Sequence, residues 1–199
     1  MFDEDKLQEL CEWTKLEEVP DLPFNSFEDL IASINDGEYA MDLSYTAARE
    51  LARIVRTPFG QIINLVLLVF PWIVIAAVIA ASFWIDNYFI LFGIPIALLA
   101  HFLGNPMMPA HNTILFMVLI GVFVFLYTLW QGQVTVSWLF GSAIFSFFSN
   151  RLMYRSNLTA LKKAAKKSET LFLYLYGKVA LRLRNIETGK EYWSLGRSA

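Results

Sequence analysis

Residues 61–150 contain one carboxylate, Asp86, and neither lysine nor arginine. A soluble protein of this size buries about 70% of the surface of its unfolded chain and covers what remains with polar and charged groups. A block this long and this poor in charge cannot form one soluble core, because too few charged side chains are left to face water. The sequence therefore predicts that the block lies in a lipid bilayer.

The two flanks of this block carry opposite charge. Residues 1–57 hold 14 acidic and 5 basic side chains, whereas residues 151–199 hold 11 basic and 3 acidic ones. The formal net charge of −2 hides this polarity. The pattern predicts an acidic helical segment at 1–57, a transmembrane domain at 58–150, and a basic helix with a β-hairpin at 151–199.

Polar and turn-forming residues divide the block into four apolar segments. These are 61–85, 88–103, 112–130 and 134–150. The first, as a helix, would rise about 37 Å and could cross a hydrocarbon core of about 30 Å. The second would reach only about 24 Å, so two crossings with a buried middle are the alternative to four. The predicted fold class is an all-α membrane protein, a four-helix transmembrane bundle with a small cytoplasmic α extension at the N-terminus and an α+β hairpin extension at the C-terminus.

Basic residues flank the block on both sides. Arg49, Arg53 and Arg56 precede it, and Arg151 and Arg155 follow it. Lysine and arginine near membrane spans are retained on the cytoplasmic side. We therefore expect both termini to be cytoplasmic, with the bacterial inner membrane as the location.

The N-terminal segment shows three helical patterns. Apolar residues at helical spacing predict a helix over Glu4–Val19. Ser26 and Ser44 are suited to cap helices over 27–34 and 45–56.

The C-terminal segment predicts one further helix and one hairpin. Ser168 can cap a helix over 170–176, with Gly177 in the position of a helix stop. Alternating apolar and basic residues then predict a β-hairpin over 178–194. Neither terminal segment is large enough for a core of its own, so we expect the two to pack into one layer and the chain to form a homo-oligomer.

Six basic residues follow the last apolar segment and form the predicted site for lipid headgroups or an anionic partner. They are Arg151, Arg155, Lys162, Lys163, Lys166 and Lys167. Juxtamembrane basic clusters attract anionic lipid with about 1 kcal/mol per residue. The alternative is that the cluster is only a topology signal. Nucleic acid is not a favoured partner, because no aromatic stacking pattern accompanies the charge.

Three serines of the last apolar segment, Ser142, Ser146 and Ser149, fall near one helical face. Small and hydroxylated faces let membrane helices pack closely. The alternative is that they line a pore, where hydroxyls replace the hydration of an ion.

No catalytic constellation is present in the sequence. Phosphate loops, nucleophile elbows and zinc-protease motifs are absent, and His101 and His111 lack the further ligands that a metal site needs. We expect no metal, no cofactor and no enzyme activity. The predicted function is a membrane anchor or sensor for a cytoplasmic protein partner, with bacterial stress or phage defence as a hypothetical context. The alternative is an oligomeric pore or ion channel lined by the third and fourth spans.

Overall fold

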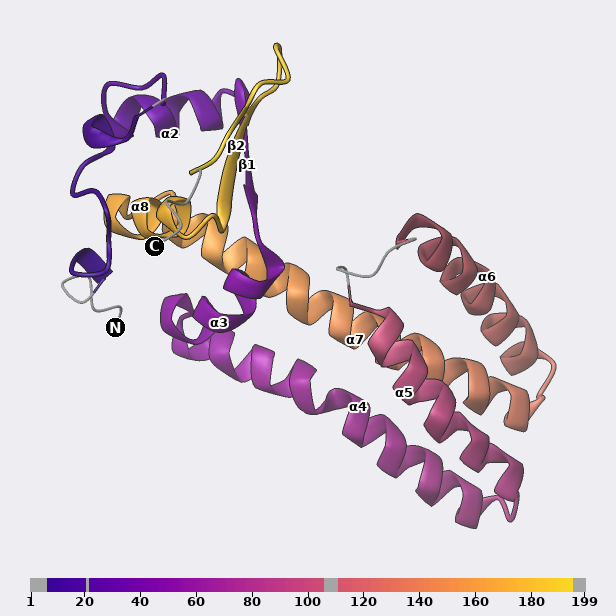
Figure 1. Ribbon diagram of the computed structural model, residues 1–199. Helices are drawn as coiled ribbons and strands as arrows, with labels where there is room; N and C mark the ends of the chain where they lie inside the picture. The colour runs from indigo at the N-terminus through magenta and orange to yellow at the C-terminus, as the bar shows by residue number, and fades with distance from the viewer. Residues whose placement is uncertain (1–6, 21, 106–110, 195–199) are drawn as a thin grey trace. The chain divides into compact units, whose positions relative to one another are not determined.

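The computed structural model describes residues 7–20, 22–105 and 111–194, apart from the side chains of 52–54, 111–113 and 115 (Figure 1). The chain forms two compact units. Unit 1 comprises Met1–Thr57 and Asn157–Ala199, and unit 2 comprises Pro58–Ser156. The chain therefore leaves unit 1 once and returns to it once, with unit 2 as an insert. The proline-rich turn at 106–110 lies outside the described residues.

Unit 1 contains a three-stranded antiparallel sheet in the order β1-β2-β3. Its strands are β1 (Tyr39–Leu43), β2 (Leu181–Asn185) and β3 (Glu191–Tyr192). Met41 lies opposite Leu183 in the register, and both side chains are buried. The sheet thus joins two segments from opposite ends of the sequence.

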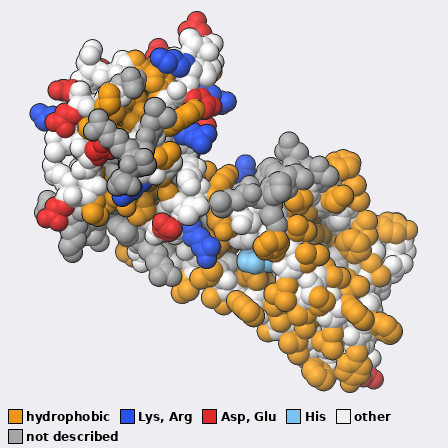
Figure 2. Space-filling model, viewed as in Figure 1, with side chains coloured by type: hydrophobic (Ala, Val, Ile, Leu, Met, Phe, Trp, Pro, Cys, Tyr) orange, Lys and Arg blue, Asp and Glu red, His pale blue; other side chains and the backbone are white. Residues whose placement is uncertain are grey.

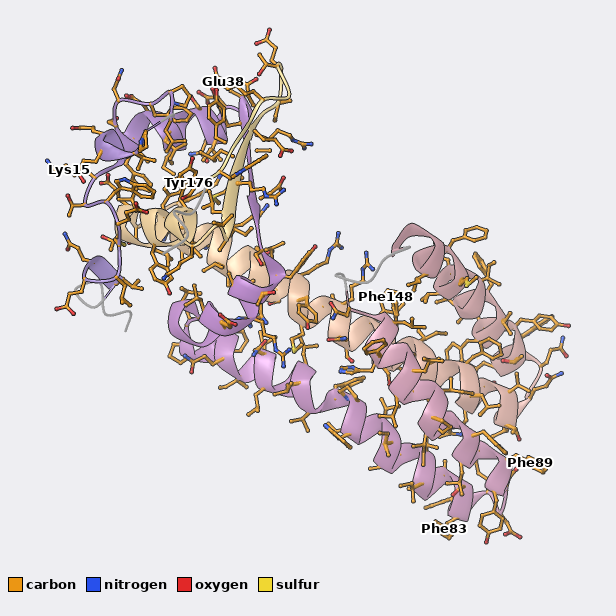
Figure 3. All side chains as sticks on the ribbon, in the orientation of Figure 1. Lys15, Glu38, Phe83, Phe89, Phe148 and Tyr176 are labelled. Atoms are coloured by element: carbon orange, nitrogen blue, oxygen red, sulfur yellow. The ribbon has the colours of Figure 1, made fainter. Side chains whose placement is uncertain are left out.

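Helices cover one face of this sheet and complete the core of unit 1. They are η1 (Leu16–Glu18), α2 (Phe27–Asn35), α3 (Tyr45–Val55), the last turns of α7 (Val134–Ala165), and α8 (Glu169–Gly177). Phe172 of α8 contacts Phe27 of α2 edge to face and stacks on Tyr176. Figure 3 shows Tyr176 on the side of α8 that faces α2. The predicted packing of the N-terminal helices against the C-terminal segment is therefore confirmed within one chain.

Local sequence signals account for several of these elements. The Ser26 side chain accepts a hydrogen bond from the Asp29 backbone N–H at 3.1 Å, so the predicted cap is confirmed. Ser168 accepts from the Leu171 N–H at 3.2 Å, which confirms the second cap. Strands β2 and β3 confirm the predicted hairpin.

The predicted helix over Glu4–Val19 is wrong over its described part. Residues 1–6 lie outside the described residues, and no continuous helix runs from Leu7 to Val19. Turns and the short 3-10 helix η1 occupy the stretch up to Glu18 instead. The side chain of Glu18 bonds back to the backbone N–H and hydroxyl of Thr14, a local bond that competes with helix formation.

Helix α8 ends differently from the prediction. Gly177 is its last helical residue, and Val179 takes the left-handed position with φ of 56°. The Ala180 N–H donates to the Leu175 carbonyl and the Val179 N–H donates to the Tyr176 carbonyl, which is a Schellman ending. Glycine is the usual residue at the left-handed position, since a β-branched side chain is strained there.

Unit 2 consists of helices that lie side by side (Figure 1). They are α4 (Pro58–Trp84), η2 (Tyr88–Phe92), α5 (Gly93–Leu103), α6 (His111–Trp130) and the larger part of α7. Phe70 of α4 and Phe125 of α6 each contact Phe145 of α7 edge to face. Helix α7 therefore touches the helices on both of its sides (Figure 1).

The predicted four-helix transmembrane bundle is wrong. Among the described residues only α4, with 27 residues, is long and apolar enough to cross a membrane by its length and composition. The apolar stretches Tyr88–Leu103 and Phe116–Trp130 are shorter, and the first of them is divided between η2 and α5. Helix α7 is long, but serine, threonine and asparagine side chains lower its hydropathy. The terminal segments are likewise not two separate extensions but one α+β unit.

Candidate functional site

Large apolar side chains are exposed on the surface of unit 2. Trp84 is 92% exposed, Trp130 is 80% exposed and Phe123 is 74% exposed. Only 17% of the most apolar stretch of α4 is buried. Figure 2 shows hydrophobic side chains over the visible face of unit 2, whereas lysine, arginine, aspartate and glutamate side chains gather on unit 1. Exposed apolar surface on this scale is typical of a surface that contacts a membrane or another protein.

The interior of unit 2 holds polar side chains. Those that are buried include Ser82, Thr128, Ser137, Ser142, Ser146, Ser149 and Asn150. Most lie on α7, on the side of the helix that meets its neighbours. These polar groups share the interior of unit 2 with apolar side chains such as Phe147 and Ile90, while large apolar side chains are exposed on its surface, which is unusual for a soluble protein.

Hydrogen bonds from these side chains join the helices. The Ser142 hydroxyl lies 3.2 Å from the Gly93 carbonyl of α5, and Asn150 Nδ2 donates to the His101 carbonyl at 2.6 Å. The Ser137 hydroxyl lies 3.2 Å from the Thr128 hydroxyl of α6. Such bonds between helices stabilise a bundle in lipid by about 0.6 kcal/mol each.

One further bond of this kind ties the turn after α4 to the start of α7. Asn87 Nδ2 donates to Thr135 Oγ1 at 2.7 Å. Asn87, Thr128, Thr135 and Asn150 were not among the predicted site residues. Their signal in the sequence was an amide or hydroxyl within an otherwise apolar segment.

Close approach of backbones accompanies these bonds. A Cβ atom added at Gly104 would lie 2.6 Å from the Phe147 carbonyl oxygen, and one at Gly141 would lie 3.1 Å from the Phe125 ring. Glycine at these positions lets α5 and α6 approach α7.

The three predicted serines are all buried on α7. Ser142 bonds across to α5, and the Ser149 hydroxyl donates to the Ser146 carbonyl within α7. The Ser146 hydroxyl has no hydrogen-bond partner among the described residues. The bond from Ser142 supports helix packing, and pore lining stays a prediction.

A half-open groove of about 460 Å³ lies among α4, α6 and α7. The residues that line it from α4 and α6 are Phe70, Ile73, Val74, Ala77, Phe125 and Leu129. Those from α7 are Ser137, Trp138, Gly141, Ser142 and Phe145. We call it the α4–α6–α7 groove. A smaller groove of about 260 Å³ lies among α5, α6 and α7, so apolar grooves flank α6 on both sides.

The six basic residues are divided between the two units, because Arg151 and Arg155 belong to unit 2 and the four lysines to unit 1. Lys162 forms an ion pair with Asp42 at 3.8 Å, and Lys166 donates to the Asn35 side chain at 2.9 Å. Both of these contacts lie within unit 1, at its surface.

The other basic residues are placed differently. Lys163, Lys167 and Arg155 are exposed, and the Arg151 guanidinium lies 5.9 Å from the centre of the Phe147 ring. Lys163 and Lys167 are thus the members of the cluster that unit 1 leaves accessible to an anionic surface.

Few ionisable groups have a perturbed pKa. Burial lowers the pKa of Arg56 and raises the pKa of Cys11. The described residues contain no group of three or more histidine, cysteine or acidic side chains that could hold a metal ion. The arrangement with the clearest chemical character is therefore the apolar exterior of unit 2 with its groove. No protein-family model, no curated protein and no solved structure matches this chain.

Proposed function

We propose that the protein is a non-enzymatic membrane anchor that holds unit 1 at a bilayer surface, where unit 1 meets a partner protein. The observation that carries the proposal is the extensive exposed apolar surface of unit 2, together with hydroxyl and amide groups buried between its helices. In hydrocarbon no water is present, so polar groups are stabilised by hydrogen bonds to one another between helices. The hydrophobic effect does not favour burial of apolar side chains there, because lipid tails are equally apolar.

The energy of exposure in water supports the same proposal. Burying a large apolar side chain is favourable by about 1.5–3 kcal/mol, and unit 2 leaves many such side chains uncovered, including Phe59, Phe89 and Phe123. Helix α4 rises about 40 Å, which exceeds a hydrocarbon core of about 30 Å. If α4 crosses a bilayer and unit 2 is embedded with it, the exposed apolar side chains of unit 2 are removed from water.

The connectivity of unit 1 supports a placement of both chain ends on one side of the membrane. Strand β1 pairs with β2, so the segments before and after unit 2 belong to one folded body. That body cannot lie on both sides of a bilayer, so after α4 the remaining helices of unit 2 would have to bring the chain back to the same side. The accessible Lys163 and Lys167 favour the cytoplasmic side, which in a bacterium is the inner face of the inner membrane.

The proposal assigns the two surfaces different partners. The exterior of unit 2 would contact lipid and further copies of the chain in a homo-oligomer. Unit 1 would contact anionic headgroups through Lys163 and Lys167, and a cytoplasmic protein through its remaining surface. If the protein acts as a sensor and not only as an anchor, unit 1 would still bind the cytoplasmic partner while unit 2 stays in lipid.

Vesicle flotation of the full chain tests the anchor. The purified protein is mixed with phosphatidylcholine vesicles during detergent removal, and the fraction that floats is measured. We expect the native chain to float and to resist extraction at alkaline pH. The double variant Leu68→Arg with Ile79→Arg should reduce the floating fraction severalfold, because both side chains are exposed on α4 and arginine is costly inside a bilayer.

Ile186→Arg provides the matched control. Ile186 is an exposed apolar residue of unit 1, so the same chemical change should leave flotation unaltered. A native chain that stays soluble without detergent, or α4 variants that float like the native chain, would overturn the proposal.

A further inference from the structure

We infer that the α4–α6–α7 groove binds an acyl chain of a membrane lipid. The inference rests on the proposed function, because it places the groove in the bilayer. It adds a ligand class and a binding site to the anchor.

The walls of the groove are fixed by contacts between the helices. The Phe145 ring of α7 contacts Phe70 of α4 on one side and Phe125 of α6 on the other. Gly141 lets the Phe125 ring approach the α7 backbone. The cavity of about 460 Å³ is thus formed before a ligand enters, and its volume lies in the range of small-molecule sites.

The chemistry of the lining selects a hydrocarbon. Its only hydroxyl groups belong to Ser137 and Ser142. The Ser137 hydroxyl lies 3.0 Å from the Gln133 carbonyl and the Ser142 hydroxyl lies 2.9 Å from the Leu139 carbonyl, so both already have acceptors. Two hydroxyl groups and the Trp138 indole N–H are the polar side-chain groups in this lining. A strongly polar ligand would therefore leave most of its hydrogen bonds to water unreplaced, whereas an acyl chain loses none.

The size of the groove favours an acyl chain over a helix of a second copy. A helix with its side chains is about 10–12 Å across, so this volume would hold only about one turn of it. A hydrocarbon chain is much thinner and can lie along the groove, between the aromatic rings of Phe70, Phe125 and Trp138.

Photo-crosslinking in vesicles tests the inference. The full chain is reconstituted in phosphatidylcholine vesicles that contain a phosphatidylcholine with a diazirine in one acyl chain, and labelled residues are mapped by mass spectrometry after irradiation. We expect at least about fivefold more labelling at Phe125 and Trp138 than at the outward residues Leu68 and Ile79.

Two adjacent alanines of α4 give a matched pair of variants. Ala77 lines the groove, and Ala76 is exposed and does not line it. Ala77→Phe should fill the groove and lower the labelling of Trp138 severalfold, whereas Ala76→Phe should leave it unchanged. Should Ala77→Phe fail to fold, as judged by its circular dichroism, Ile73→Ala widens the groove and should raise the labelling.

The outcomes separate this inference from the proposed function. Labelling of Leu68 and Ile79 without enrichment at Trp138 would overturn the groove site and leave the anchor standing, and so would an unchanged pattern in Ala77→Phe. Crosslinks from Trp138 to a second copy of the chain in place of lipid would show that a protein segment fills the groove, which also overturns the inference. No lipid label anywhere on α4 would overturn the anchor itself.

Discussion

In unit 1 the residues Leu161, Phe172 and Leu183 are fully buried, while Lys163 and Lys167 are exposed. In unit 2 the pattern differs, since Phe123 and Trp130 are exposed while several serines and Asn150 are buried beside apolar residues such as Phe147. The same chain therefore contains two different ways of dividing polar from apolar groups. The difference supports the proposed anchor, in which water surrounds unit 1 and hydrocarbon surrounds unit 2.

The two units also differ in what joins their elements. Unit 1 relies on a contiguous apolar cluster and a sheet. Among the described residues of unit 2, Val78, Ala81 and Ile90 form a small buried apolar cluster, and hydrogen bonds and glycine contacts also join the helices.

The largest effect is expected from removing a phenylalanine ring. Phe172→Ala should lower the stability of unit 1 by about 3–5 kcal/mol, because it leaves a cavity in a packed core. Phe123→Ala should change stability by less than about 0.5 kcal/mol, since Phe123 is exposed in unit 2. Amide hydrogen exchange of the full chain in detergent, followed at β1 and β2 for Phe172 and at α6 for Phe123, measures both. Equal losses would remove the contrast between the units.

A smaller effect is expected from adding a methyl group at a helix contact. Gly104→Ala should cost about 1–3 kcal/mol, because the new Cβ meets the Phe147 backbone at 2.6 Å. Gly121→Ala is the control, since its nearest neighbour would be 3.8 Å away. Thermal unfolding followed by helical circular dichroism in detergent compares the two. If Gly104→Ala and Gly121→Ala have the same melting temperature, close backbone contact at Gly104 does not stabilise unit 2.

Relief of strain in unit 1 should have the opposite sign. Val179→Gly should stabilise unit 1 by about 1 kcal/mol, because the left-handed conformation costs an L-residue about 1–2 kcal/mol. Val179→Ala is the control and should gain much less, since it keeps a Cβ. Urea unfolding measures the difference, and a destabilised Val179→Gly would show that the exposed valine side chain makes a contact worth more than the strain.

The smallest effect concerns pH. The backbone N–H of Thr14, followed by its hydroxyl, lowers the pKa of Glu18 from its usual value. A lowered folded-state pKa contributes stability above the unfolded value, near 4.5, and this contribution is lost as the pH falls through the folded pKa. Thr14→Val should raise the pKa of Glu18, which NMR titration of the Glu18 carboxyl can measure. An unchanged titration would assign the shift to the backbone alone.

The sequence allowed some elements of unit 1 to be predicted for local reasons. Ser26 and Ser168 each precede a helix whose first N–H groups need an acceptor, and β2 alternates leucine with arginine. Strand β1 was missed although Tyr39, Met41 and Leu43 alternate, because five residues carry a weak signal and β1 is completed only by β2, a partner far away in the sequence. Gly177 was the local candidate for the helix stop, but hydrogen bonds that involve Ala180 place the left-handed residue at Val179.

For unit 2 the apolar character was predicted, but the number of spans was not. Hydropathy along the sequence identified α4, while the division between η2 and α5 at Gly93 and the polar face of α7 depend on packing between helices. The serines were singled out from their spacing. The groove could not be predicted, since its residues come from three helices and meet only when the helices fold together.

The pairing of β1 with β2 determines when this protein can fold during its synthesis. The ribosome completes β1 early, yet its partner strand emerges only after the whole helical insert has been made. Until then β1, which contains Met41 and Leu43, has no β2 to pair with. An unpaired strand edge with apolar side chains is prone to aggregation. The helices of unit 2 are therefore synthesised completely before the sheet of unit 1 can form.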